Sequence, residues 1–296
     1  MTMANRDLQE LPKFSDKWSY MYFEKGHIEQ YARSVAFCYL EKRVPVPIET
    51  LASLLLGPGT TITHEAIKTI IESRCTVLWV GEQGVKCYAA AQAATYSARN
   101  LLQQVSCFEN ESERMRIVRK MYAMRFYEIV PNDITLDQLR GKEGARVRKA
   151  YKEAAEKYGI KWQGRNYDQT NWKSSDPVNR ALSAANSCLY GICLAAIISI
   201  GCSPGIGFVH TGKQLSFVYD IADLYKTELT VPIAFLAASS GEKKTDSLAR
   251  PLIRDEFRKR RFLKTIIPDI LRLLYGDSIS REDDNLPEGS DVAINY

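Results

Sequence analysis

The chain has 296 residues, of which 45% are hydrophobic and 25% charged, a composition typical of a soluble protein with a packed core. Its length favours about two domains. The 40 Lys and Arg residues exceed the 35 Asp and Glu residues by a formal net charge of +5, which permits a nucleic-acid partner without requiring one.

The cysteines and the apolar runs exclude several classes of protein. The 7 cysteines are odd in number and none forms a CxxC pair, which argues against a zinc ribbon or a disulfide framework and favours a reducing, cytoplasmic compartment. The polar first 17 residues contain Pro12 and do not resemble a signal peptide. The apolar run 188–200 is too short to span a bilayer, so we expect a buried helix and no membrane association.

The first part of the chain is expected to be rich in strands. Residues 18–23 and 34–40 are aromatic and β-branched runs, whereas prolines limit 44–48 to an edge strand. A helix is predicted over 63–73, with Thr63 as its cap. Residues 76–80 and 85–88 are predicted to form a closing hairpin around two glycines.

The composition changes near Ala89, where 89–95 form a small-residue link, and nearly everything after it is predicted to be helical. One amphipathic helix covers 111–128. Thr135 and Gln138 have the spacing of a capping box, which opens a helix to about residue 157.

Two further helical segments follow a polar loop at 165–176. Asp176 and Pro177 are suited to begin a long core helix, because proline is favoured in a first turn. Residues 246–275 are predicted as one basic helical stretch, with bends at Pro251 and Pro268. We therefore expect an α+β protein: a small β-rich N-terminal domain (1–90), a larger all-α catalytic domain (91–276) and an acidic flexible tail (277–296).

Residues 207–223 are the stretch with the clearest chemistry. Thr211 and Gln214 have capping-box spacing, so a helix is predicted to begin just after Thr211. Asp220 and Asp223 are three residues apart and share a side of that helix, and His210 precedes it. An imidazole and two carboxylates suit Mg²⁺ or Mn²⁺. The predicted buried face of the helix consists of Leu215, Val218, Tyr219 and Ala222.

The simpler interpretation of this stretch is a solvated pair of aspartates beside an ordinary loop histidine. The neighbours of Asp220 and Asp223 count against it, because the helix is apolar on nearly every side. A carboxylate buried there without a partner would cost several kcal/mol, so these groups need partners.

A second candidate is Glu143, which lies between Gly141 and Gly144 in the helix that Thr135 opens. Each glycine weakens a helix by about 1 kcal/mol relative to alanine. Close approach of another backbone or of a substrate would explain why they are tolerated. The alternative is that Glu143 pairs with Lys142 or Arg146 along its own helix.

Several motifs in the same order give the chain a family resemblance. Residues 139–148 (LRGKEGARVR) and 205–213 (GIGFVHTGK), together with the helix 215–223, resemble the CRISPR-associated integrase that acquires new spacers. The resemblance is closest to the type I-E branch and covers nearly the whole chain. Supporting segments are 80–85 (VGEQGV), 165–168 (RNYD) and 186–191 (NSCLYG).

The resemblance implies a metal-dependent DNA integrase and endonuclease of CRISPR adaptation. Such an enzyme joins the 3′-hydroxyl ends of a prespacer to the CRISPR repeat by transesterification. It implies that Glu143, His210 and Asp223 bind Mg²⁺ or Mn²⁺, and that Asp220 is a further acidic residue needed at that site. It also implies a homodimer, two of which flank a small dimeric CRISPR-associated subunit in a hetero-hexamer.

The resemblance further implies DNA contacts, mostly to phosphate because prespacers vary in sequence. Arg250 and Arg254 match DNA-contacting positions, although a single surface arginine is more often a solvated charge. The positions that match those holding the single-stranded prespacer end are Tyr167, Tyr190, Lys213 and Tyr219. A core role is equally compatible with Tyr190 and Tyr219. The remaining candidates for DNA contact are Lys86 and Trp172.

Two positions depart from the family pattern. Lys25 stands where relatives carry an aromatic that braces the end of the prespacer duplex, and Tyr22 is a nearby aromatic that could replace it. Lys86 stands where relatives carry an arginine, so a bidentate phosphate contact becomes a point charge. Two other functions remain open at this point: a DNA-binding scaffold with a degenerate metal site, and a stand-alone metal nuclease that cuts branched DNA.

Overall fold

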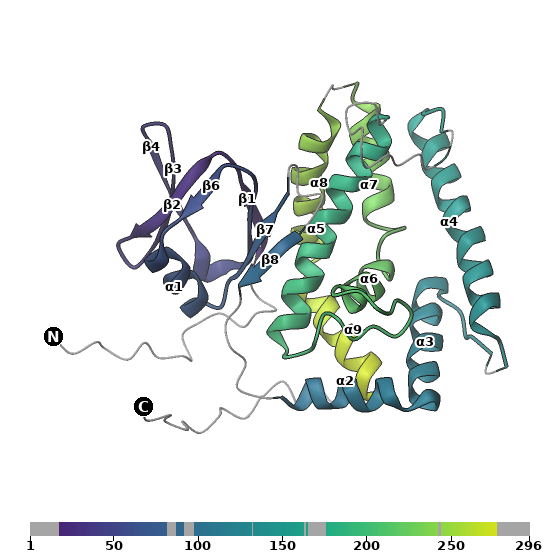
Figure 1. Cartoon of the computed structure of the whole chain (residues 1–296). Helices are drawn as coiled ribbons and strands as arrows, with labels where there is room; N and C mark the ends of the chain where they lie inside the picture. Colours follow the sequence, from purple (N-terminus) through teal and green to yellow (C-terminus); the bar gives the residue numbers. More distant parts are fainter. Residues whose placement is uncertain are drawn as a thin grey trace.

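The computed structural model describes residues 18–81, 87–91, 98–131, 133–162, 164, 176–241 and 244–276. Strands dominate the first part of the chain and helices form the rest, which confirms the expected α+β class (Figure 1). The predicted acidic tail, 277–296, lies outside the described residues. The division of the chain into domains at residue 90 stays a prediction.

The first of two sheets carries the strand order β1-β5-β7-β8. Strands β1, β5 and β7 are parallel, and β8 pairs with β7 in the antiparallel sense, so the predicted hairpin is present. Its second strand extends to Ala91, into the segment predicted as a linker, because Ala89 to Ala91 continue the ladder with β7. The strands are β1 (Trp18–Phe23), β5 (Leu51–Leu56), β7 (Thr76–Val80) and β8 (Cys87–Ala91).

The second sheet has the order β4-β3-β2-β6. Strand β4 lies at its edge, where the lack of an N–H at Pro45 is tolerated, as the sequence predicted. Helix α1 (His64–Glu72) follows β6 and begins where expected, because the Thr63 hydroxyl accepts from the Ala66 N–H at 3.2 Å. The strands are β2 (Gly26–Tyr31), β3 (Ser34–Tyr39), β4 (Lys42–Val46) and β6 (Thr60–Ile62).

Strand β5 lies between the second sheet and the helices, and every one of its residues is buried. Leu51 and Leu54 belong to the core shared with the second sheet and α1. Ala52 and Leu55 belong to the core shared with the helices. Polar and apolar residues do not alternate along these six residues, as expected for a strand that is covered on both faces.

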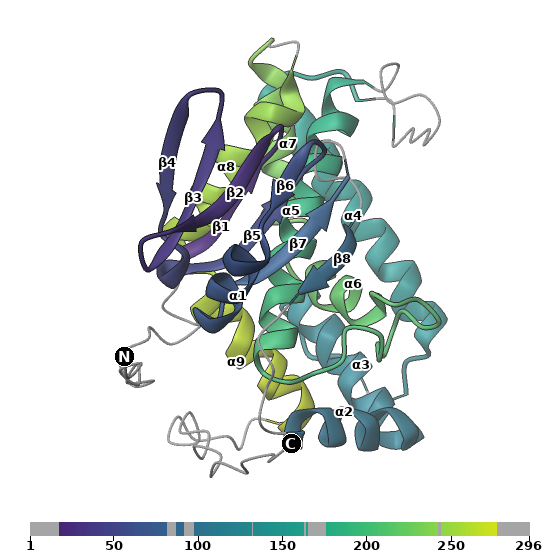
Figure 2. The ribbon, with the colours of Figure 1, turned by 60° about the vertical axis from the view of Figure 1, so that its left-hand side comes forward.

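Helix α5 is the centre of the helical half. It packs against α6, α7, α8 and α9, and its other side contacts β5 (Figures 1 and 2). The helices are α2 (Arg99–Glu109), α3 (Glu111–Phe126), α4 (Leu136–Tyr158), α5 (Pro177–Ser199), α6 (Ser216–Asp223), α7 (Thr230–Ser239), α8 (Thr245–Lys259) and α9 (Leu263–Tyr275).

The sequence predicted α5 well because its determinants are local. The Asp176 carboxylate accepts from the N–H groups of Val178 and Asn179, and Pro177 lies in the first turn. In the described part of the chain, α5 is the one helix long and apolar enough to cross a membrane. Of its most apolar window, 83% is buried inside the protein, as expected for a core helix.

The sequence predicted the basic stretch 246–275 as one helical stretch bent at its prolines, but it forms two helices. Pro251 and Pro268 lie inside α8 and α9, and the chain breaks between these helices instead. Arg261 adopts the left-handed conformation (φ 48°), and the Phe262 N–H donates back to the Phe257 carbonyl at 2.9 Å. The two phenylalanine rings stack at 4.9 Å, so an apolar contact closes the helix end.

Gly191 lets α5 approach the sheet closely. A Cβ atom there would lie 3.3 Å from Cδ1 of Leu78 and 3.7 Å from Cδ2 of Leu55. We predict that Gly191→Val lowers the free energy of unfolding by about 1–3 kcal/mol, because the added methyl groups overpack this contact. Urea denaturation measures the change.

Gly141→Ala is the matched control, since no atom lies within 4 Å of the added Cβ in α4. It should raise the free energy of unfolding by about 0.5–1 kcal/mol. Equal stability of Gly191→Val and the wild type would show that the helix and the sheet are not in tight contact at this point.

Candidate functional site

The loop at 207–210 is folded around the carboxylate of Asp220. This side chain lies on α6 and is fully buried. Its Oδ2 accepts from the N–H groups of Phe208 (2.6 Å) and Val209 (3.0 Å), and its Oδ1 accepts from the N–H of His210 (2.9 Å). The carboxylate therefore stabilises the loop by filling the hydrogen-bonding needs of three consecutive amides.

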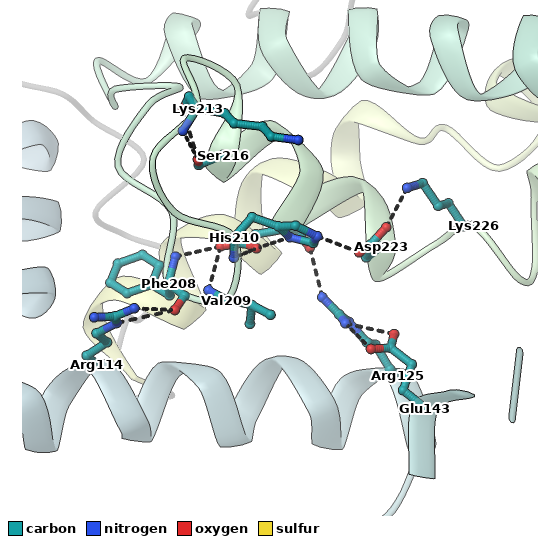
Figure 3. A network of polar contacts seen from close by, with 11 residues as sticks. Arg114, Arg125, Glu143, Phe208, Val209, His210, Lys213, Ser216, Asp223 and Lys226 are labelled. Atoms are coloured by element: carbon teal, nitrogen blue, oxygen red, sulfur yellow. Dashed lines mark hydrogen bonds and ion pairs between the residues drawn. The ribbon is translucent and has the colours of Figure 1, made fainter. Parts of the chain in front are cut away.

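The same carboxylate orients the imidazole of His210. Nδ1 lies 2.7 Å from Oδ1 of Asp220, and since an ionised carboxylate only accepts, Nδ1 carries the hydrogen. Nε2 then presents its lone pair in the neutral ring and faces Oδ2 of Asp223 at 3.8 Å (Figure 3). The imidazole is 42% exposed, so a ligand can reach it.

Gly207 permits this loop geometry. A Cβ atom there would lie 2.3 Å from the carbonyl oxygen of His210 and 2.8 Å from the backbone of Ser216. Arg114 of α3 holds the loop from the other side, because its Nε and Nη2 donate to the Phe208 carbonyl at 3.3 and 3.2 Å (Figure 3).

The predicted capping box of Thr211 and Gln214 is wrong. Helix α6 begins at Ser216, and its N-cap residue, Leu215, makes no side-chain capping bond. A tight turn takes the place of the cap: Ser216 Oγ accepts from the Lys213 N–H and donates to the Lys213 carbonyl. Of the predicted buried face, Val218 and Ala222 are buried, whereas Leu215 and Tyr219 are half-buried.

Asp223 is paired with a cation. Its Oδ1 lies 2.6 Å from Nζ of Lys226, one turn further along the chain. Burial alone would raise the pKa of Asp223, but Lys226 and Arg125 together hold it below its usual range. For Lys226, burial works toward a lower pKa, yet the charge of Asp223 prevails and raises it. The ammonium also lies 4.8 Å from the ring centre of Tyr190.

Glu143 is paired with a cation too. Both of its oxygens lie within hydrogen-bond distance of Nη1 of Arg125, at 2.7 and 2.8 Å. The suggested partner Lys142 pairs with Glu128 instead, at 3.4 Å. The glycines that flank Glu143 do not serve a close approach of backbone within the chain: a Cβ at Gly141 would meet no atom within 4 Å, and one at Gly144 would meet only the guanidinium of Arg148 at 3.4 Å.

The structure brings two of the three predicted metal ligands together. His210 and Asp223 face each other, whereas Glu143 is turned toward Arg125 (Figure 3). Across the described residues, no group of three or more His, Cys, Asp or Glu side chains is arranged to hold a metal ion. The donor types fit Mg²⁺ or Mn²⁺, but Glu143 is paired with Arg125 rather than grouped with His210 and Asp223.

The predicted DNA contacts of the helical half lie at two places. Tyr190 and Tyr219 meet edge to face at 5.2 Å beside His210, and both are half-buried. Lys213 is exposed on the same loop. Arg254 is exposed on α8, where it lies 3.4 Å from Asp255. Lys86, Tyr167 and Trp172 lie outside the residues that the structure describes.

Arg250 is unusual because it is largely buried yet incompletely paired. Its guanidinium stacks on the Tyr22 ring at 4.8 Å, and its Nε and Nη2 are buried without a hydrogen-bond partner, although Asp246 lies 3.8 Å away. Tyr22 also donates to Glu24 at 2.9 Å. One face of this ring is thus occupied by Arg250. Lys25 is exposed and adopts a left-handed backbone conformation (φ 57°).

Sequence reasoning missed Arg125 and Lys226. Arg125 continues the buried stripe of Val118, Met121 and Tyr122 on α3, and a charge at helical spacing within an apolar stripe indicates a buried ion pair. Lys226 follows Asp223 by three residues, a spacing at which helical side chains meet.

We predict that Asp220→Asn destabilises the folded protein by about 2 kcal/mol or more. An asparagine offers one oxygen, and its NH₂ group would face amide donors that are left unsatisfied. Chemical denaturation measures the loss. Asp137→Asn, whose side chain is 91% exposed, is the control and should change stability by at most about 0.5 kcal/mol. Equal effects of the two substitutions would contradict the structural role of Asp220.

Comparison with known proteins identifies the family. The family model described as CRISPR associated protein Cas1 matches residues 20–132 and 124–252. The chain is 43% identical over 283 residues to CRISPR-associated endonuclease Cas1 2 of Thermus thermophilus, covering 96% of this chain and 87% of that protein. It is 44% identical over 268 residues to CRISPR-associated endonuclease Cas1 of Clostridium sp., covering 90% of this chain and 89% of that one.

Among solved structures, the crystal structure of a TtCas1–DNA complex superposes with a TM-score of 0.80 and 42% sequence identity, covering 89% of this chain and 94% of that chain. The second match of the family model, 124–252, includes the loop around Asp220 and helix α6. The chain belongs to the Cas1 family.

Proposed function

We propose that this protein is a metal-dependent DNA integrase and endonuclease of CRISPR adaptation, which joins prespacer 3′-hydroxyl ends to the CRISPR repeat. The observation that carries the proposal is the arrangement of His210, whose ring is fixed by Asp220 so that Nε2 faces Asp223. The relatives named endonucleases and the TtCas1–DNA complex support a DNA substrate.

Glu143, His210 and Asp223 are the residues that would hold Mg²⁺ or Mn²⁺. When bound, such an ion polarises the phosphate and stabilises the charge that develops on its oxygens. Asp220 acts through His210: it keeps the hydrogen on Nδ1 and the lone pair on Nε2. A buried carboxylate behind a ligating histidine fixes the direction of the ring.

The reaction is an exchange of phosphodiesters. The prespacer 3′-oxygen forms a bond to phosphorus, the bond from phosphorus to the 3′-oxygen of the repeat strand breaks, and the proton of the attacking hydroxyl ends on the leaving oxygen. One phosphodiester is made and one is broken, so no external energy source is needed. Tyr190, Tyr219 and Lys213 are suited to hold the single-stranded end beside His210, by stacking and by charge.

The assembly is part of the proposal. We expect a homodimer, and two homodimers on either side of a small dimeric CRISPR-associated subunit, in the cytoplasm. Membership of the Cas1 family supports this arrangement. The mild positive charge of the chain supports a DNA partner. The type I-E assignment and the division into 1–90, 91–276 and 277–296 belong to the same proposal.

We predict that Asp223→Asn, Glu143→Gln and His210→Ala each bind prespacer DNA but fail to join it to repeat DNA. Each substitution removes a proposed ligand, while DNA is held mainly by basic residues elsewhere. Gel analysis of strand-transfer products checks the outcome.

The wild type should join prespacer to repeat DNA in the presence of Mg²⁺ or Mn²⁺, and EDTA should stop this reaction. Robust integration by Asp223→Asn, or by the wild type in EDTA, would contradict the metal assignment. Simple cuts without joined products would favour a stand-alone nuclease, and absence of both, with DNA binding intact, would favour a DNA-binding scaffold.

We predict that Arg250→Ala and Arg254→Ala weaken prespacer binding about equally for different sequences and reduce its salt dependence. Phosphate contacts release counterions, so each lost contact lowers the slope of log K against log salt by about 1. Arg254 is the stronger candidate, because its side chain is 48% exposed whereas that of Arg250 is 12% exposed. Fluorescence anisotropy at several salt concentrations measures both quantities.

Lys149→Ala is the control for these two variants. Its side chain is 77% exposed on α4 and lies 3.7 Å from Glu153. It should leave affinity and slope unchanged. If both arginine variants keep the wild-type affinity and salt slope, Arg250 and Arg254 do not contact DNA, and they are structural residues or solvated charges.

A further inference from the structure

Each of the two carboxylates proposed as metal ligands already has a cation of the protein beside it. Arg125 Nη1 contacts both oxygens of Glu143, and Lys226 Nζ lies 2.6 Å from Oδ1 of Asp223 (Figure 3). The two cations differ in their freedom to move. The side chain of Lys226 is 25% exposed, whereas that of Arg125 is not exposed at all.

Arg125 is held from several sides. Its Nη2 donates to the backbone carbonyl of Asp220 at 3.4 Å, and its guanidinium stacks on the Tyr122 ring at 4.9 Å. Within the described residues, its one ion pair is with Glu143. A guanidinium stays ionised at any ordinary pH, and a buried ion requires a counter-charge. Arg125 is therefore a fixed positive charge beside the proposed metal site.

Glu143 has more freedom than its partner. Its side chain is 21% exposed, and it lies on α4 between Gly141 and Gly144. A Cβ atom at Gly141 would meet no atom within 4 Å, and one at Gly144 would meet only the end of the flexible Arg148 side chain. Glu143 is therefore the accessible member of the pair, whereas Arg125 is enclosed.

We propose that Arg125 is the internal counter-cation of Glu143. In the metal-free protein, Arg125 pairs with the Glu143 carboxylate and so competes with a divalent cation for it. The inference rests on the proposed function, because it takes Glu143, His210 and Asp223 as the ligands. Arg125 keeps the metal-free site folded and lowers its affinity for the ion. Cation binding then requires Glu143 to turn from Arg125 toward His210 and Asp223.

The test is titration of the purified, metal-free full chain with Mn²⁺, without DNA, followed by isothermal calorimetry or by electron paramagnetic resonance of free Mn²⁺. Arg125→Gln removes the charge and leaves a shorter polar side chain in its place. The Kd for Mn²⁺ should fall about fivefold or more, because a positive charge next to the ion is lost. A residue with only a structural role would leave binding unchanged or weaken it, and either result overturns the proposal.

Three further variants isolate the charge and the partner. Arg125→Lys keeps the charge, so its Kd should stay within about twofold of the wild type. Lys142→Gln, beside Glu143 but paired with Glu128, should also stay within about twofold. In the Glu143→Gln background, Arg125→Gln should have a smaller effect than in the wild type. An undiminished effect there would show that Arg125 does not act through Glu143.

A second measurement does not depend on the folding of any variant. A crystal structure of the wild type with Mn²⁺ should show Glu143 bound to the ion and separated from Arg125. An ion held by His210 and Asp223 with the Arg125–Glu143 pair intact would overturn the inference and leave the metal site standing. No Mn²⁺ binding by the wild type, or binding that His210→Ala and Asp223→Asn leave unchanged, would instead overturn the proposed metal site and the inference with it.

Discussion

The buried carboxylate of Asp220 is the interaction on which the site depends. It is fully enclosed and satisfied by three backbone amides and the imidazole of His210. Such a charge is tolerated inside a protein because each oxygen is saturated with donors. Its geometry then determines the rest: the loop curls toward α6, Gly207 must lack a side chain, and the His210 ring has one direction. Asp220 thus builds the site, while Asp223 faces Nε2 of His210 from the end of α6.

The core carries this arrangement because α6 packs on α5, and α5 in turn is held against β5. Gly191 brings α5 close to the Leu55 and Leu78 side chains, so the helical half rests directly on the sheet. Arg114 and Arg125 project from one helix, α3, to the loop at Phe208 and to Glu143 of α4. The site therefore joins α3, α4 and α6, which the chain order separates.

Features set by neighbours within a few residues could be predicted from the sequence. Thr63, the capping box of Thr135 and Gln138, and Asp176 with Pro177 all begin helices as expected, since each contact spans one turn. The same signal was wrong at Thr211, because Asp220 fixes the preceding loop and a Ser216 turn replaces the cap. The helix break at Arg261, the burial of β5 on both faces and the pairing of Glu143 depend on contacts between distant segments, which local patterns do not encode.

The charges around His210 explain how a site rich in carboxylates folds before any cation is bound. Asp220, Asp223 and Glu143 supply three negative charges, and Arg125 and Lys226 supply two positive ones within hydrogen-bond distance of Glu143 and Asp223. Three uncompensated carboxylates in a partly buried site would repel one another and raise the free energy of the folded state. Internal pairing removes that cost, but it also places positive charge at the proposed cation site. If the proposed ligands bind a cation, Arg125 and Lys226 stabilise the folded protein and at the same time lower its affinity for that cation.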